Sequence, residues 1–458
     1  MYTRRGFLKT TAYAGIGFTV VSALEPLTAF AAVTRANPAG ESPIVLFLNG
    51  VRRLIEGYPE EDLVKWGDMI KLANLYLQYG DTERAVKVVS DAAEAAETFK
   101  GFHADTDKAS ILNKAAKFFK SIGDDRASRF CTLEAFQVTP RIPETGIEED
   151  CMISSAVNLA VIGEKEKALM MLDSAGRIIK PRSLCMTLEL ASAYEEMETI
   201  YGDYRMHDKA MDIVYAFSKN ETIDERHKAR WLAKIQERYL DMGKGQLAYN
   251  FMGTVMDCYN NLDKTKRYGV AEDISAVWAR YGEWERAFEI AEEGSRENCY
   301  FRIAGHAIKT GEMDIARKAA YPALTNLKAA DERYLFELSF PEVAALFVSL
   351  GDAGQAERII HESLNYLEGS SLLKYFRIIE LSGIAALYGR MGRNSDARKL
   401  LHKALESVDA KEDITYRAES MLTIAEAYIS SRIVIGDKEM AVLKGIVREN
   451  NYCIPVGA

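Results

Sequence analysis

The sequence predicts an all-α fold, a right-handed α-α superhelical solenoid of about ten helix pairs, and three observations lead to this prediction. A glycine is followed five residues later by a small residue nine times. These glycines recur at intervals of roughly forty residues, which indicates one supersecondary unit stacked many times. On both sides of them, apolar residues recur at spacings of three and four, as in amphipathic helices. The predicted hinges are Gly80, Gly123, Gly163, Gly243, Gly282, Gly311, Gly351, Gly392 and Gly436.

The chain begins with a segment that we interpret as a removable export signal. Thr3-Arg4-Arg5-Gly6-Phe7-Leu8-Lys9 precedes an apolar run that ends in small residues. The segment resembles a twin-arginine signal, which implies the twin-arginine translocase as a partner during export, a periplasmic or otherwise exported location, and no stable membrane anchor after cleavage. The residues expected to be recognised are Arg4, Arg5, Phe7 and Leu8, and those at the cleavage site are Ala29 and Ala31.

The conformational freedom of glycine explains the turn between the two helices of each repeat unit. Glycine takes the left-handed conformation at a helix C-terminus without steric cost, so each hinge glycine is expected to end the first helix of a pair. An acid usually follows, such as Asp352, and can cap the second helix. The small residue five positions after the glycine, Ala356 in the same unit, is expected where the two helices approach closely.

The residues before each hinge predict the core of the pair. An aliphatic residue mostly lies eight positions before the glycine, alanine often lies seven before, and a large side chain lies four before. In the unit of Gly351 these are Val343, Ala344 and Phe347. The three positions share one face of the first helix, which is therefore expected to be buried.

Two units depart from this spacing. Leu190-Ala191-x-x-Tyr194 places the expected hinge on Glu198, yet the chain continues through Tyr201-Gly202-Asp203. In the last unit, Ile424-Ala425-x-x-Tyr428 is followed by an extra turn before Gly436. Both departures predict a lengthened helix or an inserted loop.

The combination Leu-Ala-x-x-Tyr before Gly-Asp-x-x-x-Ala resembles the tetratricopeptide repeat over about residues 60 to 450. The period near forty exceeds the thirty-four residues of that family, and most units lack its late proline. The interval also falls to twenty-nine between Gly282 and Gly311, so a HEAT-like or other α-α repeat is the alternative. The expected organisation is a signal peptide at 1–31, a linker and N-terminal capping helix at 32–60, the repeat array at 61–450 and a C-terminal tail at 451–458.

Composition narrows the classes of partner. The formal net charge of −9 argues against nucleic acid and anionic lipid, because both require basic surfaces. The six cysteines lie far apart without a metal or redox spacing, so buried free thiols are expected for most of them, with Cys453 in the tail as the exception. The six histidines are scattered as well. No catalytic, metal or cofactor motif is found, and the chain is expected not to be an enzyme.

The remaining candidate is a surface. In tetratricopeptide-like arrays the first helices line a concave groove that holds a peptide. The resemblance implies that the first helices of this chain line such a groove as well. The candidate groove residues are Asn74, Lys117, Lys120, Arg280, Lys309 and Arg390, which would suit a partner with an acidic segment. Arg302, Arg377 and Arg417 are expected to add guanidinium groups.

These features favour an exported scaffold or adaptor that binds a protein or peptide partner in the groove. An accessory or assembly subunit of a twin-arginine-exported redox complex is one alternative. An enzyme with a dispersed site in the groove is the other.

Overall fold

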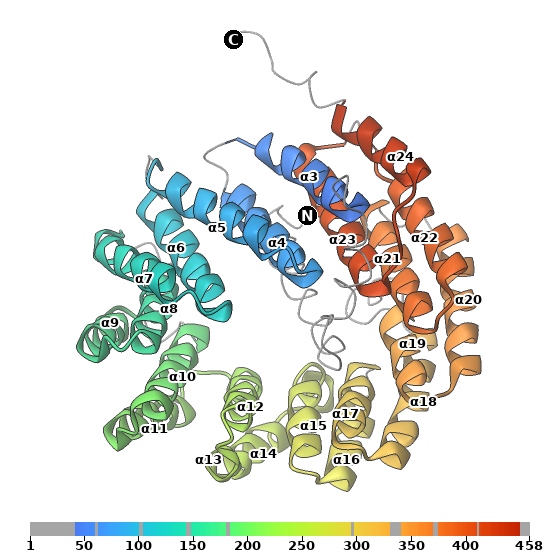
Figure 1. Cartoon of the computed structure of the whole chain (residues 1–458). Coiled ribbons are helices and arrows are strands. Elements are labelled where there is room, and N and C mark those ends of the chain that lie inside the picture. The colour runs from blue at the N-terminus through green and yellow to red at the C-terminus, as the bar shows by residue number, and fades with distance from the viewer. Residues whose placement is uncertain are drawn as a thin grey trace, which may run out of the picture. The chain divides into compact units, whose positions relative to one another are not determined.

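The computed structural model describes residues 42–59, 63–99, 104–142, 148–179, 184–294, 297–329, 340–369, 374–409 and 412–448. All regular secondary structure in these ranges is helical, which confirms the predicted all-α fold (Figure 1). The residues of the predicted signal and its cleavage site, the tail with Cys453, and residues 143–147 of a predicted loop lie outside the described residues.

Helices follow one another as first and second members of hinged units. The first helices are α4 (Leu63–Tyr79), α6 (Ala104–Ser121), α8 (Glu148–Val161), α10 (Leu184–Tyr201), α12 (Glu225–Asp241), α15 (Ala271–Arg280), α17 (Glu297–Thr310), α19 (Phe340–Ser349), α21 (Lys374–Arg390) and α23 (Ile414–Ser431). The second helices are α5 (Thr82–Ala96), α7 (Asp125–Val138), α9 (Lys165–Ile178), α11 (Tyr204–Ser218), α13 (Gly245–Asn250) with α14 (Met252–Asn260), α16 (Trp284–Gly294), α18 (Met313–Ala329), α20 (Ala353–Gly369), α22 (Asn394–Glu406) and α24 (Asp437–Arg448). Helix α3 (Pro43–Glu56) precedes them, and short 3-10 turns lie at η2 (Thr139–Arg141) and η3 (Lys264–Lys266).

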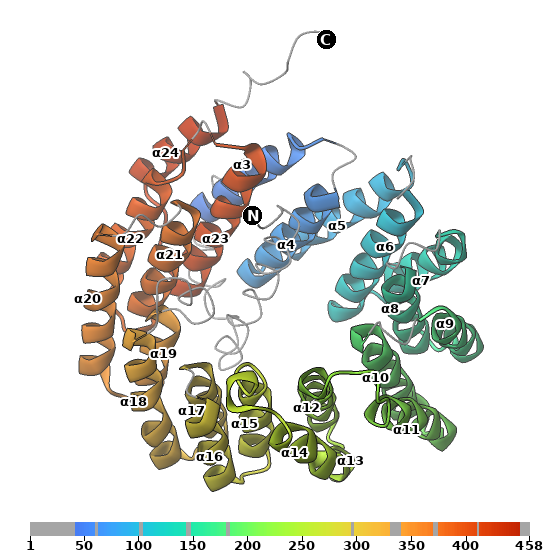
Figure 2. The same ribbon diagram turned by 180° about the vertical axis from the view of Figure 1, so that it is seen from behind.

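The chain forms two compact units. Unit 1 contains residues 1–88 and 327–458, and unit 2 contains residues 89–326, so the division falls inside α5 and inside α18. In unit 2, successive first helices from α6 to α17 pack against one another in a row. The second helices form another row, packed against one side of the row of first helices (Figures 1 and 2). In unit 1, α19, α21, α23 and α4 form the corresponding series.

Eight of the predicted hinges are confirmed. Gly80, Gly123, Gly163, Gly243, Gly282, Gly311, Gly351 and Gly392 all have φ between 74° and 92°. At each hinge the next residue donates its backbone N–H to the carbonyl of the residue four before the glycine, as Asp352 N does to Phe347 O at 2.9 Å; this residue is large at every one of the eight hinges except Gly311, where it is Ala307. This bond belongs to the Schellman C-cap, which requires a left-handed residue. The residue five after each of these glycines is buried, and Ala356 is fully so.

The prediction that Gly436 is a hinge is wrong. Helix α23 ends at Ser431, and Arg432 takes the left-handed conformation with φ 56°. Ile433 N then donates to Tyr428 O at 3.2 Å, so the C-cap has its usual distance from the tyrosine. The extra residues form an inserted, non-helical connection, and Ala441, expected to be buried, is exposed.

The other irregular unit has a lengthened helix. Helix α10 continues beyond Glu198 to Tyr201, and Gly202 takes the left-handed conformation with φ 63°. The Lys244 ammonium donates to Glu195 Oε2 and to Glu198 Oε2, the latter at 2.5 Å. Lys244 stands directly after a hinge, where most units have an acid, and its ion pairs hold the last turns of α10 in place.

The short interval between Gly282 and Gly311 also has a visible cause. Helices α16 and α17, which lie between these two glycines, have 11 and 14 residues, and both are shorter than most of their counterparts. Gly294 in α16 lies so close to α15 that an added Cβ would be 2.4 Å from Ala271 Cβ. The short helices account for the short interval, and the missing side chain of Gly294 allows α16 to approach α15 closely.

The cysteine prediction is confirmed for the described residues. Cys131, Cys151, Cys258 and Cys299 are buried free thiols, and Cys185 is partly exposed. Burial raises the pKa of the Cys131 thiol to about 11, which keeps it protonated and unreactive at neutral pH.

Candidate partner-binding surface

The predicted groove residues lie on the first helices and divide between the two units. Asn74 and Arg390 belong to unit 1, and Lys117, Lys120, Arg280 and Lys309 belong to unit 2. All except Arg280 have exposed side chains. The structure therefore places two separate sets on two first-helix faces, by which we mean the solvent-exposed sides of the first helices within each unit.

Two members of the unit 2 set already have partners within the chain. The Arg280 guanidinium forms an ion pair with Asp241 Oδ1 at 2.7 Å and donates to the Glu237 carbonyl at 3.0 Å. Lys120 pairs with Asp125 Oδ1 at 2.7 Å, across the hinge between α6 and α7. Arg280 is consequently a contact between neighbouring first helices, α15 and α12, as well as a surface residue.

A larger network surrounds Arg302 on α17. Its guanidinium pairs with Glu237 of α12 and with Asp273 Oδ1 of α15, the latter at 3.1 Å. Burial lowers the pKa of Arg302, but the carboxylates of Glu237, Asp273 and Glu272 raise it more, so that the net shift is upward. Because α15 is short, Arg302 reaches past it to α12. The carboxylates that Arg302 binds belong to the chain itself rather than to a partner.

Sequence reasoning missed these acids. Arg238 of α12 pairs with Glu189 of α10, and Arg230 of α12 pairs with Asp273 of α15 at 3.3 Å. Together with the Arg280 and Arg302 contacts, ion pairs join the first helices from α10 to α17. Glu237 and Asp241 lie six and two residues before Gly243, but Asp273 lies nine before Gly282, so no single spacing in the sequence marks these acids.

Four of the six predicted groove residues have side chains without a hydrogen-bond or ion-pair partner in the described part of the chain. Lys117 and Lys309 in unit 2, and Asn74 and Arg390 in unit 1, form no hydrogen bond or ion pair with the described residues. Although Arg390 is exposed, partial desolvation by the surrounding atoms lowers the pKa of its guanidinium from the ordinary value. Glu426 of α23 is exposed six residues before the Arg432 cap, at the position equivalent to Asn74. The unit 1 face is thus mixed in charge rather than basic.

The other two predicted arginines, Arg417 and Arg377, are buried and half-buried respectively. Arg417 is buried, and its Nη1 donates to the Ile446 carbonyl of α24 at 3.3 Å. Arg377 has a buried Nε that lacks a hydrogen-bond partner. Neither is part of an open basic face.

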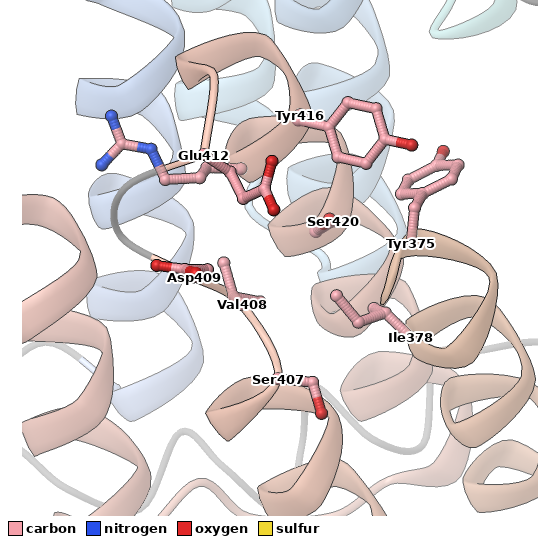
Figure 3. A pocket seen from close by; sticks show the side chains of 9 residues that line it. Tyr375, Ile378, Ser407, Val408, Asp409, Glu412, Tyr416 and Ser420 are labelled. Atoms are coloured by element: carbon pink, nitrogen blue, oxygen red, sulfur yellow. The ribbon is translucent and has the colours of Figure 1, made fainter. Parts of the chain in front are cut away.

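A small hollow lies between α21, the end of α22 and the start of α23 (Figure 3). The rings of Tyr375 and Tyr416 meet there with centroids 5.0 Å apart, while Asp409 and Glu412 lie nearer the connection between α22 and α23. Its empty volume is about 230 Å³, including open solvent. Because this volume counts open solvent, the enclosed space is far below the range of about 300–1,000 Å³ usual for small-molecule sites, and a protein surface is a better candidate for binding than this hollow.

Within the described ranges, no group of three or more His, Cys, Asp or Glu side chains is arranged to hold a metal ion. None of the helices that the structure describes is both long and apolar enough to cross a lipid bilayer.

Comparison with known proteins gives little beyond the helical architecture. No protein-family model matches the sequence. No curated protein matches it either. Among solved structures, Ton1535 from Thermococcus onnurineus NA1 has 15% identity, with 78% of this chain and 98% of that chain covered, at a TM-score of 0.32. Yeast Tom70 has 11% identity, with 84% of each chain covered, at a TM-score of 0.32. A circular tandem repeat protein has 14% identity, with 89% of this chain and 96% of that chain covered, at a TM-score of 0.22. TM-scores of this size carry no argument about function, and the assignment of a tetratricopeptide-like repeat rests on the hinges and core positions described above.

Proposed function

We propose that the chain is a scaffold or adaptor that binds a protein or peptide partner on the first-helix faces of its two units. One observation carries this proposal. The repeat register leaves polar and basic side chains exposed on first helices, Lys117 and Lys309 in unit 2 and Asn74 and Arg390 in unit 1, while the opposite sides of these helices are buried in the array. Side chains presented on a rigid series of helices favour recognition of an extended surface. The cations among them suit a partner with an acidic segment.

The partner is sought by capture. Mature chain carrying an affinity tag is cross-linked in its native envelope, purified, and its cross-linked proteins are identified by mass spectrometry. Lys117→Glu with Lys309→Glu reverses the open charges of unit 2, and Arg390→Glu does so in unit 1. We expect each variant to reduce recovery of a specific partner about tenfold if that unit's face binds it, because reversing a charge adds repulsion to a lost attraction.

Matched controls keep this experiment interpretable. Arg126→Glu and Lys438→Glu reverse exposed charges near the starts of the second helices α7 and α24. Arg280 is left unchanged, because its replacement would break the ion pair with Asp241 and weaken unit 2 itself. Equal recovery from wild type and from all the variants would exclude the first-helix faces as the binding surface, and so would equal losses in the variants and the controls.

We further propose export through the twin-arginine route, with Arg4 and Arg5 as the recognised pair. The support is the sequence motif and the small residues Ala29 and Ala31 behind the apolar run. Arg4→Lys with Arg5→Lys is expected to leave precursor in the cytosol, and Arg35→Lys, beyond the expected cleavage site, is expected to leave export intact. Cell fractionation and precursor size report the outcome, and normal processing of the double variant would refute the route.

A further inference from the structure

We infer that the contact joining α3 and α4 to α23 and α24 is a pH-sensitive latch between the two ends of the chain, closed in mild acid and looser in mild base. This inference does not depend on the proposed function. All four helices belong to unit 1, in which residues 43–88 and 327–448 are separated along the chain by the whole of unit 2. Their packing therefore holds two distant segments together without a direct covalent link.

The apolar part of the latch is α3. Its buried face includes Phe47, Leu48, Val51, Leu54 and Ile55, all of which have no exposed area. This face meets helices at the other end of the chain, because α3 packs against α23 and α24 as well as against α4 (Figure 1). Helix α3 consequently lies beside α23, in the place that a second helix takes beside its first helix in the regular units.

Individual contacts define this docking. The ring centroids of Phe47 and Tyr428 are 5.7 Å apart, and Tyr428 is the large residue four before the left-handed Arg432. A Cβ added at Gly50 would lie 3.2 Å from both Cδ atoms of Leu443, so the helices α3 and α24 approach closely at this glycine. The Tyr58 hydroxyl donates to the Thr415 carbonyl at 3.1 Å.

The polar part of the latch is where α4 faces α23. Asp68 on α4 is 1% exposed and pairs with Lys71 at 2.9 Å. Its Oδ2 lies 3.2 Å from the Tyr58 hydroxyl, whose single proton is shared between Asp68 and the Thr415 carbonyl. Lys71 also interacts electrostatically with Glu419 and Glu426 on α23. Three carboxyl groups thus act on the Lys71 ammonium group, and ionisation of Glu419 adds negative charge beside Asp68.

Besides Glu380 of α21, whose pKa burial raises to about 8, Glu419 titrates near neutral pH. Burial raises its pKa to about 7, the Asp68 carboxylate raises it as well, Lys71 opposes this, and Asp413 on α23 adds a smaller upward effect. Tyr375 on α21 and Tyr416 on α23 also face Glu419, and both phenols have pKa values raised by burial above their ordinary value, so they stay neutral. Protonated Glu419 fits this surrounding, and ionised Glu419 adds repulsion toward Asp68.

The sign of the pH effect follows from linkage. A carboxyl whose pKa is higher in the closed state than in the open state binds its proton more tightly when closed, so the closed state loses stability as pH rises. With the closed-state pKa at about 7, and an open-state pKa at about 4.3, the closing equilibrium constant falls about tenfold between pH 6 and pH 8.

Hydrogen exchange of the full mature chain tests the latch. Protection factors of α3 amides, corrected for the intrinsic exchange rate, are expected to fall about tenfold from pH 6 to pH 8, while those of α8 in unit 2 stay unchanged. Glu419→Gln is expected to remove the fall, and Glu83→Gln, at an exposed carboxylate of α5, is expected to retain it. Equal α3 protection at both pH values would overturn the latch, and a fall that persists in Glu419→Gln would overturn the role of Glu419.

A cross-link tests the docking itself. Gly50→Cys with Leu443→Cys places two thiols at the closest approach of α3 and α24, and we expect a disulfide to form on oxidation. The oxidised protein should show pH-independent protection of α3, and reduction of the same sample should restore the tenfold fall. Failure to cross-link, or an unchanged fall in the oxidised protein, would contradict the proposed latch.

Discussion

The hinge between α19 and α20 and the connection between α23 and α24 end their first helices by the same hydrogen bond. Asp352 N donates to Phe347 O at 2.9 Å in one, and Ile433 N donates to Tyr428 O at 3.2 Å in the other. The left-handed residue is Gly351 with φ 75° in the first case and Arg432 with φ 56° in the second. In the last repeat the distance from the large buried residue therefore marks the end of the first helix and the glycine does not, whereas in α10 the left-handed Gly202 marks the end and the distance from Tyr194 does not.

The two regions differ in the chain segment after the cap. Helix α20 begins at Ala353, two residues after Gly351, and Ala356 is buried between the helices. After Arg432, residues 433–436 are not helical, and α24 begins at Asp437, where the Glu439 carboxylate accepts from Gly436 N at 3.0 Å. The inserted connection lets α24 pack against α22 and α3 while α3 packs beside α23. An irregular last repeat is thus the condition for docking the N-terminal helix.

The largest difference between the two regions is expected in the stability cost of leucine at Ala356 and at Ala441, the small residues five positions after Gly351 and Gly436. Ala356→Leu should destabilise unit 1 by about 1–3 kcal/mol, because a fully buried alanine leaves no room for the added atoms. Ala441→Leu, at an exposed position, should change stability by less than about 0.5 kcal/mol. Urea unfolding of the two variants measures both effects, and equal costs would mean that the two positions are packed alike.

The second largest difference is expected in the stability cost of alanine at Gly351 and at Gly436. Gly351→Ala places a Cβ on a left-handed residue and should cost about 1–2 kcal/mol. Gly436 is not left-handed, and a Cβ there would lie 2.9 Å from Glu439 Oε2, the end of a flexible side chain that can move away. Gly436→Ala should therefore stay within about 0.5 kcal/mol of wild type in the same urea experiment. A cost at Gly436 as large as at Gly351 would contradict the assignment of Arg432 as the cap.

The regular repeats could be predicted from sequence because their signals are local. A left-handed cap, a small residue five positions later and a buried face before the hinge depend on residues within one unit, and Gly351, Ala356 and Phe347 are found where these rules place them. The error at Gly436 arose from giving the glycine more weight than the distance from Tyr428. Arginine is an unusual left-handed residue, so the spacing was the available clue.

The candidate surface was less predictable because it depends on contacts between units that are distant in sequence. Lys117 and Lys309 were expected to be exposed and are exposed. Arg280 was also placed on the correct helix, but its partner Asp241 comes from the preceding first helix. The docking of α3 on α23 and α24 joins the two ends of the chain, and no local spacing in the sequence reports such a contact.

The smallest expected effect concerns the cap of the last repeat and has the opposite sign. Arg432→Gly should stabilise unit 1 by about 0.5 kcal/mol, because relief of the left-handed strain exceeds the added entropy of glycine in the unfolded chain. Arg432→Ala serves as the control, since alanine has the same left-handed cost as arginine and lacks the guanidinium. A small rise in the urea midpoint for the glycine variant, with no rise for the alanine variant, would confirm that backbone conformation governs this position. A loss of stability in both variants would show instead that the contacts of the arginine side chain outweigh its backbone strain. Those contacts, and not the backbone conformation, would then determine which residue is favourable at position 432.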